Sequence, residues 1–375
     1  MRRRLLAPAF VALVACTSVP PAVRAPDPEI APPPGERAPT DWAKDTHSPN
    51  DAALELVAQR IVDERARGVG TPDVDKIVAW MRRYGEPHVR PRVISATGQA
   101  PLATDVLDAQ IAASRNAHTR WAIARGPLPH GGETVTALLL DAVADMTPLP
   151  TRARTGEWLT FDAKLHVPAR DAKVIVLGPR GVPRTVPTSF DAATRTAHAT
   201  FVVDHPGAFV VQLVGDLAEG PRPLLEARVF ADADPPTNDE GLPAVPGEAE
   251  GDDLGALVAG LRASELLPAL KRDARLDAIA REHAERMLDA HTIAHDLGEG
   301  DLRARFVEAG LDARMVGENV ARGSSVREAH RAIYASPSHR TNLLRAEYTH
   351  LGVAQVRGDD GVVYVCEVFA SGLLR

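Results

Sequence analysis

The sequence predicts a multidomain protein. A small helical region comes first, an all-β sandwich follows, and helices flank a short sheet as an α-β-α sandwich in the C-terminal domain. With 375 residues, 45% of them hydrophobic, the chain can form two or three apolar cores. Two proline-rich segments interrupt the chain. The hydrophobic period changes from helical to strand-like and then to a mixture of both, which predicts these three parts in this order.

Residues 1–15 have the pattern of an export signal. Three arginines precede the apolar run Leu5–Ala15, which is too short to span a bilayer. The run ends in Leu13-Val14-Ala15-Cys16, which resembles the lipobox of bacterial lipoproteins. The resemblance implies cleavage before Cys16, acylation of its thiol and attachment to a membrane without a spanning helix. An ordinary signal peptide with an incidental cysteine is the alternative. Thr17 replaces the aspartate that retains many lipoproteins at the inner membrane, which favours the outer membrane or cell surface.

Charge and cysteine content exclude some functions. Loss of residues 1–15 removes three arginines and changes the net charge from −7 to −10, and only 4% of the residues are aromatic. Nucleic acid is therefore not an expected partner. If Cys16 is acylated, Cys366 has no cysteine partner, so no disulfide framework is expected. Cys366 lies in a strand-like run and is expected to be a buried, inert thiol.

Two segments are expected to be linkers. Residues 16–48 are rich in proline, favour extended conformations and predict a tether that holds the folded part away from the membrane. Residues 233–252 combine proline with acidic residues and predict an interdomain linker.

The first folded region, residues 49–130, shows helical periodicity. Two helices are expected within Asp51–Tyr84, and a third over Thr104–Ala124, which includes Trp121. His88, His118 and His130 are isolated from each other and are interpreted as surface or packed residues.

Residues 133–232 predict a β-sandwich of immunoglobulin-like kind. Short strand-like runs recur at intervals of roughly ten residues, with glycine and proline turns between them. No cluster of reactive residues accompanies them, so a spacer or adhesive module is expected. The expected strands are Thr134–Leu140, Trp158–Val167, Lys173–Leu177, Thr196–Val203, Ala208–Val214 and Leu224–Phe230.

Residues 253–375 mix helices and strands. The expected helices are Leu254–Leu261, Asp273–Leu288, Asp301–Ala309 and Val326–Tyr334. The expected strands are Asn319–Ala321, Leu351–Val356 and Val362–Phe369. His283 falls on the apolar face of its helix and is interpreted as a packed core residue.

Three short motifs follow one another in this domain: Ala294-His295-Asp296, Gly317-Glu318-Asn319-Val320-Ala321 and Ser336–Leu344. Ser336 can cap a helix with Pro337 at its first position, which places His339 in the first turn. His295 is expected on a loop and Glu318 at the start of a strand, so the three side chains can converge in one cleft. Two imidazoles and a carboxylate form a donor set suited to zinc, with an open position for water.

Together with the strand-like Leu351–Ala354, these motifs resemble the bacterial branch of the CAP superfamily (cysteine-rich secretory, antigen five and pathogenesis-related proteins) over the last third of the chain. The resemblance implies an α-β-α sandwich whose cleft holds two histidines and two glutamates, with the histidines able to bind a divalent metal. His295, Glu318 and His339 match three of these residues. The second glutamate is missing from the end of the preceding helix, Ile333–Ser336, and Glu328 lies two turns too early to replace it.

A purely structural network is the alternative to a metal or ligand site. Glu318 and Asn319 can bond to backbone groups and lock the strand, and the two histidines can be satisfied partners in that network. Asn342 is interpreted as a cleft residue that mainly secures the helix or loop, with a catalytic role as the alternative.

Three functions remain open. The first is an exported, membrane-anchored module that binds a lipid, peptide or protein, with a divalent metal, zinc first, in the cleft. The second is an extracellular hydrolase in which Glu318 and His339 activate a water or Ser338, or a bound zinc supplies hydroxide. Neither a Gly-x-Ser-x-Gly nor a His-Glu-x-x-His motif supports it. The third is a structural envelope protein whose β-sandwich makes the contacts.

Overall fold

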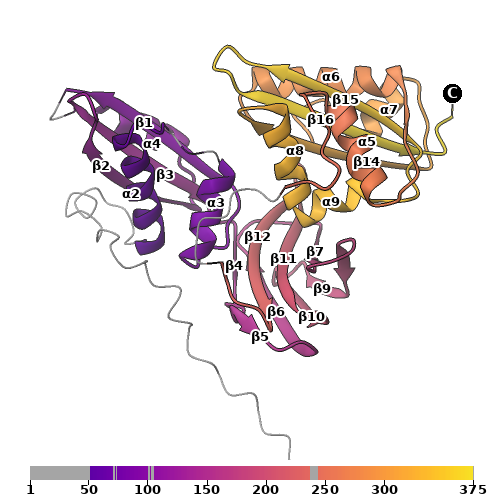
Figure 1. The fold of residues 1–375 in the computed structure, drawn as a ribbon, viewed down its shortest axis with the longest axis horizontal. Helices are drawn as coiled ribbons and strands as arrows, with labels where there is room; N and C mark the ends of the chain where they lie inside the picture. Colours follow the sequence, from indigo (N-terminus) through magenta and orange to yellow (C-terminus); the bar gives the residue numbers. More distant parts are fainter. Residues whose placement is uncertain are drawn as a thin grey trace, which may run out of the picture.

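The computed structural model describes residues 51–70, 72, 74–99, 102, 105–236 and 244–374, which form three bodies in chain order (Figure 1). The predicted signal peptide, Cys16 and the tether of residues 16–48 lie outside these residues, so the lipoprotein assignment stays a prediction. Within the described ranges, no helix combines the length and the apolar character needed to cross a membrane.

The first body is not purely helical, which corrects the prediction for residues 49–130. Its helices are α2 (Ala52–Ala66), α3 (Val74–Arg83) and α4 (Asp105–Ser114). They pack on an antiparallel sheet of order β1-β3-β2, formed by β1 (Pro91–Gly98), β2 (Thr119–Pro127) and β3 (Glu133–Asp141). Alternate β3 residues point to opposite faces: Leu138 and Leu140 pack with α2, and Ala137 and Leu139 pack with α4. The strand predicted at Thr134–Leu140 therefore exists, but it completes this sheet.

The predicted third helix ends early, and Trp121 lies on β2. Asn116 forms a turn at the boundary: its side-chain oxygen accepts the His118 N–H at 2.8 Å, and its own N–H donates to Thr119 Oγ1 at 2.8 Å. Such Asx turns compete with helical hydrogen bonding and separate α4 from the strand.

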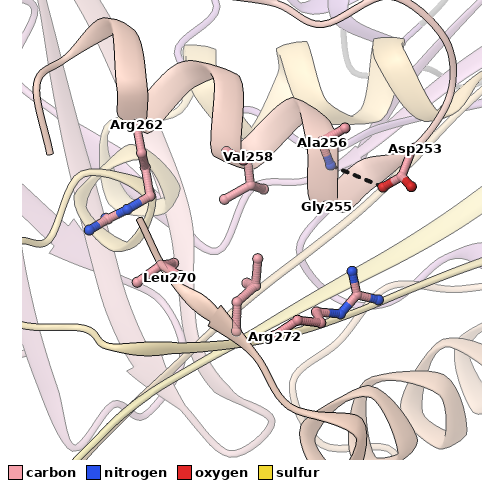
Figure 2. A pocket seen from close by; sticks show the side chains of 9 residues that line it. Asp253, Gly255, Ala256, Val258, Arg262, Leu270 and Arg272 are labelled. Atoms are coloured by element: carbon pink, nitrogen blue, oxygen red, sulfur yellow. Dashed lines mark hydrogen bonds between the residues drawn. The ribbon is translucent and has the colours of Figure 1, made fainter. Parts of the chain in front are cut away.

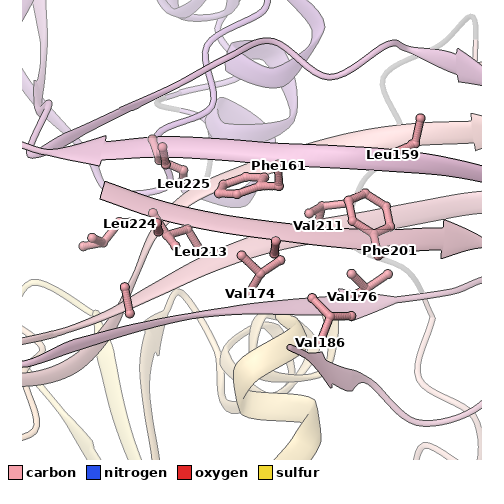
Figure 3. Packing of buried hydrophobic residues seen from close by; sticks show 14 of the residues in the cluster. Leu159, Phe161, Val174, Val176, Val186, Phe201, Val211, Leu213, Leu224 and Leu225 are labelled. Carbon is pink, nitrogen blue, oxygen red and sulfur yellow. The ribbon is translucent and has the colours of Figure 1, made fainter. Parts of the chain in front are cut away.

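The second body contains two sheets around one core. The first sheet has the order β4-β6-β10-β9, and the second has the order β5-β12-β11-β7-β8. Phe161 and Phe201 of the first sheet pack against Val211 and Leu213 of the second (Figure 3). The strands are β4 (Ala144–Met146), β5 (Arg152–Ala153), β6 (Glu157–Leu165), β7 (Asp171–Leu177), β8 (Arg184–Val186), β9 (Thr188–Asp191), β10 (Thr196–Val203), β11 (Gly207–Leu217) and β12 (Gly220–Ala231). An all-β body with one internal core is thus present, while its immunoglobulin-like character stays a prediction.

The third body has the predicted α-β-α layers. Its sheet has the order β13-β15-β16-β14, and β16 supplies side chains to both faces. Val363, Val365 and Phe369 pack under α5, α8 and α9, while Tyr364 and Cys366 pack under α6 and α7. The elements are α5 (Leu254–Ser264), β13 (Lys271–Arg272), α6 (Ala274–Asp289), α7 (Leu302–Glu308), β14 (Met315–Gly323), α8 (Val326–Ala335), α9 (Pro337–Leu343), β15 (His350–Arg357) and β16 (Val363–Ser371).

Polar side chains join the three bodies. Arg82 of α3 pairs with Glu226 of β12 at 2.5 Å, and Glu226 accepts a hydrogen bond from Gln212 of β11 at 3.0 Å. Gln212 in turn accepts the backbone N–H of Ser338 at 3.0 Å, where α9 meets β11 (Figure 1). This chain of contacts fixes the second body against the helix that carries His339.

Candidate functional site

His295 and Glu318 meet as the motifs predict. His295 lies on the loop between α6 and α7, Glu318 lies on β14, and His295 Nδ1 is 2.7 Å from Glu318 Oε1. His339 occupies the first turn of α9. Burial, then the charges of His295 and Arg90, lower the pKa of His339 to about 3. His339 is therefore neutral at physiological pH.

Glu318 is held by a buried ion pair that the sequence analysis did not identify. Its Oε2 lies 2.7 Å from Arg305 Nη2, and both side chains are buried. The Cys366 thiol donates to the same oxygen at 3.6 Å. Burial alone would raise the pKa of Glu318, but the hydrogen bond and charge of His295, with the charge of Arg305, hold it at about 2. Arg305 also donates to the His295 carbonyl at 3.1 Å, so it fixes both residues.

His283 is buried as predicted, but it has polar partners. Its Nδ1 lies 2.5 Å from Glu299 Oε1, and its Nε2 lies 2.8 Å from the Ala294 carbonyl and 3.8 Å from Glu318 Oε1. Glu299 also accepts the Leu297 N–H at 3.0 Å. The His283–Glu299 pair thereby fixes the loop that carries His295. The helical period locates His283, but nothing in the sequence indicates that Glu299 is its partner.

Asn319 and Asn342 attach α9 to β14. The side-chain amide of Asn342 donates to Asn319 Oδ1 at 2.9 Å and to the Glu318 carbonyl at 3.1 Å. The amide of Asn319 donates to the His339 carbonyl at 3.2 Å and to Glu367 Oε2 at 2.9 Å. These contacts are structural: they set the position of His339 relative to Glu318.

Glu328 does not replace the missing glutamate. Glu328 accepts the Ser324 N–H at 2.6 Å and belongs to the start of α8, where Ser325 caps the helix. Ser336 is the N-cap of α9, but its side chain makes no capping hydrogen bond, contrary to the expectation. Its Oγ instead accepts a bond from Gln212 Nε2 at 3.3 Å.

Glu318, the carboxylate of the predicted metal-ligand set, is engaged by other side chains. Arg305 and Cys366 occupy one oxygen of Glu318 and His295 occupies the other, so this carboxylate orients His295 from behind. Because Glu318 contacts Nδ1 of His295, the ring nitrogen of His295 that remains as a candidate metal-ligand atom is Nε2. The imidazole of His339 is the second such candidate. Among the described residues, no group of three or more His, Cys, Asp and Glu side chains is arranged to hold a metal ion.

The other two bodies border the histidine face, on which His295 and His339 are half-buried. Arg90 of the first body donates to the Ile293 carbonyl at 2.8 Å. Gly220, at the turn between β11 and β12, packs so closely that a Cβ placed there would lie 3.4 Å from His295 Cβ. A surface hollow of about 250 Å³ lies elsewhere, between α5 and β13 (Figure 2). The arginine in that hollow, Arg262, is saturated by the carbonyls of Pro268, Leu343 and Arg345.

Comparison with known proteins supports the family resemblance. The profile of the CAP family, described as the cysteine-rich secretory protein family, matches residues 256–368. No curated protein matches this chain with significant sequence similarity.

Three solved structures are similar to parts of the chain. An outer surface protein of Borrelia burgdorferi has 23% identity over 32% of this chain and 89% of its own, with a TM-score of 0.30. An extracellular protein containing an SCP domain from Bacillus anthracis has 18% identity over 60% and 88%, with a TM-score of 0.30. A cysteine-rich secretory protein of Staphylococcus aureus has 11% identity over 80% and 90%, with a TM-score of 0.27. These similarities are low, and the assignment rests on the profile match and the α-β-α layers. Residues 256–368 of this multidomain chain form a CAP domain.

Proposed function

We propose that this chain is an exported lipoprotein, anchored through Cys16, whose CAP domain is a non-enzymatic module that binds a lipid, peptide or protein ligand. The His295–His339 face is the contact surface of the module. The second body, as an immunoglobulin-like sandwich, serves as the spacer and as part of that surface. The anchor follows from the lipobox-like Leu13–Cys16 and the proline-rich tether.

The state of Glu318 is the observation that carries the binding role. A general base works best when its pKa lies near the operating pH. Glu318, with a pKa of about 2 and a buried Arg305 partner, is a poor base, and His339, with a pKa of about 3, is a weak one. Both are instead suited to holding a fixed arrangement of hydrogen-bonding groups.

The contacts of Ser338 argue against the hydrolase. Its hydroxyl lies 3.3 Å from Ser336 Oγ, and its N–H donates to Gln212. Within the described ranges, no hydrogen bond joins Ser338 to His339 or Glu318. A serine nucleophile needs a base within hydrogen-bond reach, and this arrangement does not provide one.

Zinc binding stays a prediction, now with His295 Nε2 and His339 as the protein donors. Glu318 would orient His295 without touching the metal. Calorimetric titration of zinc into the full chain tests this. Saturable binding that is lost in the double variant His295→Ala, His339→Ala would support a two-imidazole site, and equal heats in both proteins would reject it.

The binding role is tested on protein purified from its own envelope. Native mass spectrometry and extraction should find a retained molecule in the wild type and less of it in the His295→Ala, His339→Ala variant. Neither protein should turn over ester or peptide substrates. Turnover by the wild type that is abolished in Glu318→Gln or His339→Ala would establish the hydrolase instead.

Cys16→Ser should move the protein from the membrane fraction to the soluble fraction, and retention in the membrane would reject the anchor.

A further inference from the structure

Two arginines from different bodies converge on the loop that precedes His295. Arg90, between α3 and β1, donates to the Ile293 carbonyl at 2.8 Å. Arg322, on β14, donates to the His291 carbonyl at 3.4 Å. Since the two carbonyls are only two residues apart, the two guanidinium groups lie on the same short stretch of chain.

A third arginine comes from β12 of the second body. The segment before β1 runs antiparallel to β12: the Glu226 N–H donates to the Pro87 carbonyl at 2.7 Å, and His88 forms a β-bridge with Leu225. This register carries Arg90 alongside Arg222. Gly220, which packs on His295, is two residues from Arg222 on the same strand. The three bodies therefore each place one arginine beside the histidine face.

The three arginines at this junction have no direct ion pair with a carboxylate of the described residues. Among the described residues, no carboxylate lies within ion-pair distance of Arg90, Arg222 or Arg322, and Arg222 Nε is buried without a hydrogen-bond partner. Two acids act on Arg90 from beyond ion-pair distance: Asp141, which pairs with Arg92 at 2.9 Å, and Glu219, whose side chain is exposed.

The neighbouring arginines change the pKa of Arg90. Burial and then the charge of Arg222 lower the pKa of Arg90 to about 10. Arg322 lowers it further, while the charge of Asp141, which has a larger effect than that of Arg322, and the charge of Glu219 oppose the shift. The charge of Arg90 in turn lowers the pKa of His339. Like charges gathered in a partly buried place are unfavourable unless an opposite charge joins them.

We propose that this three-body junction binds an anionic group, a phosphate or a carboxylate, through the guanidinium groups of Arg90, Arg222 and Arg322, with His295 and His339 at its edge. This inference rests on the proposed binding function and names the chemistry of the ligand. Guanidinium forks match the oxygen geometry of both anions, and the charge-assisted bonds are short and strong. The anion can be a free solute or one end of a larger ligand, and the choice of probes below distinguishes the two.

Calorimetric titration of the full chain tests the proposal with three probes: inorganic phosphate, glycerol 1-phosphate and succinate. Arg222→Gln is the informative variant, because Arg222 makes no described hydrogen bond or ion pair whose loss would disturb the fold. We expect saturable binding of at least one probe, weakened about tenfold or more in Arg222→Gln, as for loss of a hydrogen bond to a charged group. Preference for inorganic phosphate, glycerol 1-phosphate or succinate would assign a free phosphate, a headgroup-like phosphate or a carboxylate.

Arg180→Gln is the matched control. Arg180 is exposed in a turn of the second body, and its replacement removes the same unit of charge. Probe affinity should remain within about twofold of the wild type, since distant exposed charges are screened at physiological salt. No saturable binding of any probe, or equal effects of Arg222→Gln and Arg180→Gln, would overturn the proposal.

Measuring the co-purified molecule in the same variants separates the two proposals. If the wild type and Arg222→Gln retain it equally while no probe binds, the anion site is rejected and the binding module stands. If the His295→Ala, His339→Ala variant retains it as well as the wild type does, the proposed histidine contact surface itself is rejected.

Discussion

At the scale of single residues, Glu318 has the role of an anchor. The buried carboxylate of Glu318 is paired with Arg305 and stays ionised. Its other oxygen holds the His295 ring in place. Removal of one member of such a pair leaves an uncompensated buried charge, which costs far more than the pair contributes when intact. The charged pair therefore specifies the geometry of the histidine face, and the two imidazoles are the groups that remain to meet a ligand.

His339 makes stability depend on pH between its unfolded and folded pKa values. Above pH 6.5 the ring is neutral in both states. As the pH falls below 6.5, the unfolded chain takes up a proton that the folded ring does not bind until about pH 3, so acid favours unfolding. The wild type should lose up to about 1.4 kcal/mol of stability per pH unit from this residue. Glu318 adds a separate loss only below pH 4.5, as the pH falls towards about 2.

Urea unfolding at a series of pH values from 7 to 4.5 checks this prediction. His339→Ala should flatten the dependence across that window, because its ring no longer takes up the proton. The control His130→Ala, at an exposed position of the first body, should keep the wild-type slope. Parallel slopes for His339→Ala and the wild type would contradict the pKa assigned to His339.

At the scale of elements, α9 is held on β14 by a buried polar network. Asn319 is the only described hydrogen-bond donor to the fully buried Glu367, whose other oxygen lies 3.5 Å from His330 Nδ1. Asn319→Ala removes that donor and leaves a buried carboxylate poorly satisfied, so we expect a loss of about 3 kcal/mol or more. Asn342→Ala breaks contacts in the same network but does not touch Glu367, and should cost about 1 kcal/mol. Urea unfolding compares the two variants, and similar losses would mean that Glu367 does not depend on Asn319.

The helices and strands of the CAP domain could be predicted because their signals are local. The 3.6-residue stripe of α6 and the mostly apolar run of β16, interrupted by Glu367, lie within single windows of sequence. Helical periodicity alone also predicts that α4 continues across the Asn116 turn, because Trp121 lies at a spacing that fits the helix. Sequence periodicity likewise assigns β3 to the wrong sheet, since alternation shows that a strand has two faces and does not show which strands it pairs with. The roles of Arg305 and Glu299 could not be predicted for a related reason: the tertiary fold, and not the local sequence, determines which charged side chains become ion partners.

At the scale of the whole molecule, the histidine face is a junction of three bodies. The motifs of the CAP domain predict a cleft, but they contain nothing about Gly220, Arg90 or Gln212, which lie in other bodies and contact the loop of His295 and the helix of His339. Interdomain contacts of this polar kind usually permit relative motion. The position of α9, which carries His339, is therefore coupled to the second body.

Gln212 is the residue through which this coupling can be tested. It is buried, accepts the Ser338 N–H, and donates to Ser336 Oγ and to Glu226. Gln212→Ala removes all three bonds, and about 1–2 kcal/mol of local stability should be lost at the junction. Hydrogen exchange of the α9 amides should then become about tenfold faster, while the α6 amides on the far face of the sheet stay protected. The matched control Gln355→Ala, on β15 and away from the junction, should leave α9 exchange unchanged. Unchanged α9 exchange in Gln212→Ala would mean that α9 is held by the Asn319–Asn342 contacts alone, and that the second body rests on the histidine face without restraining it.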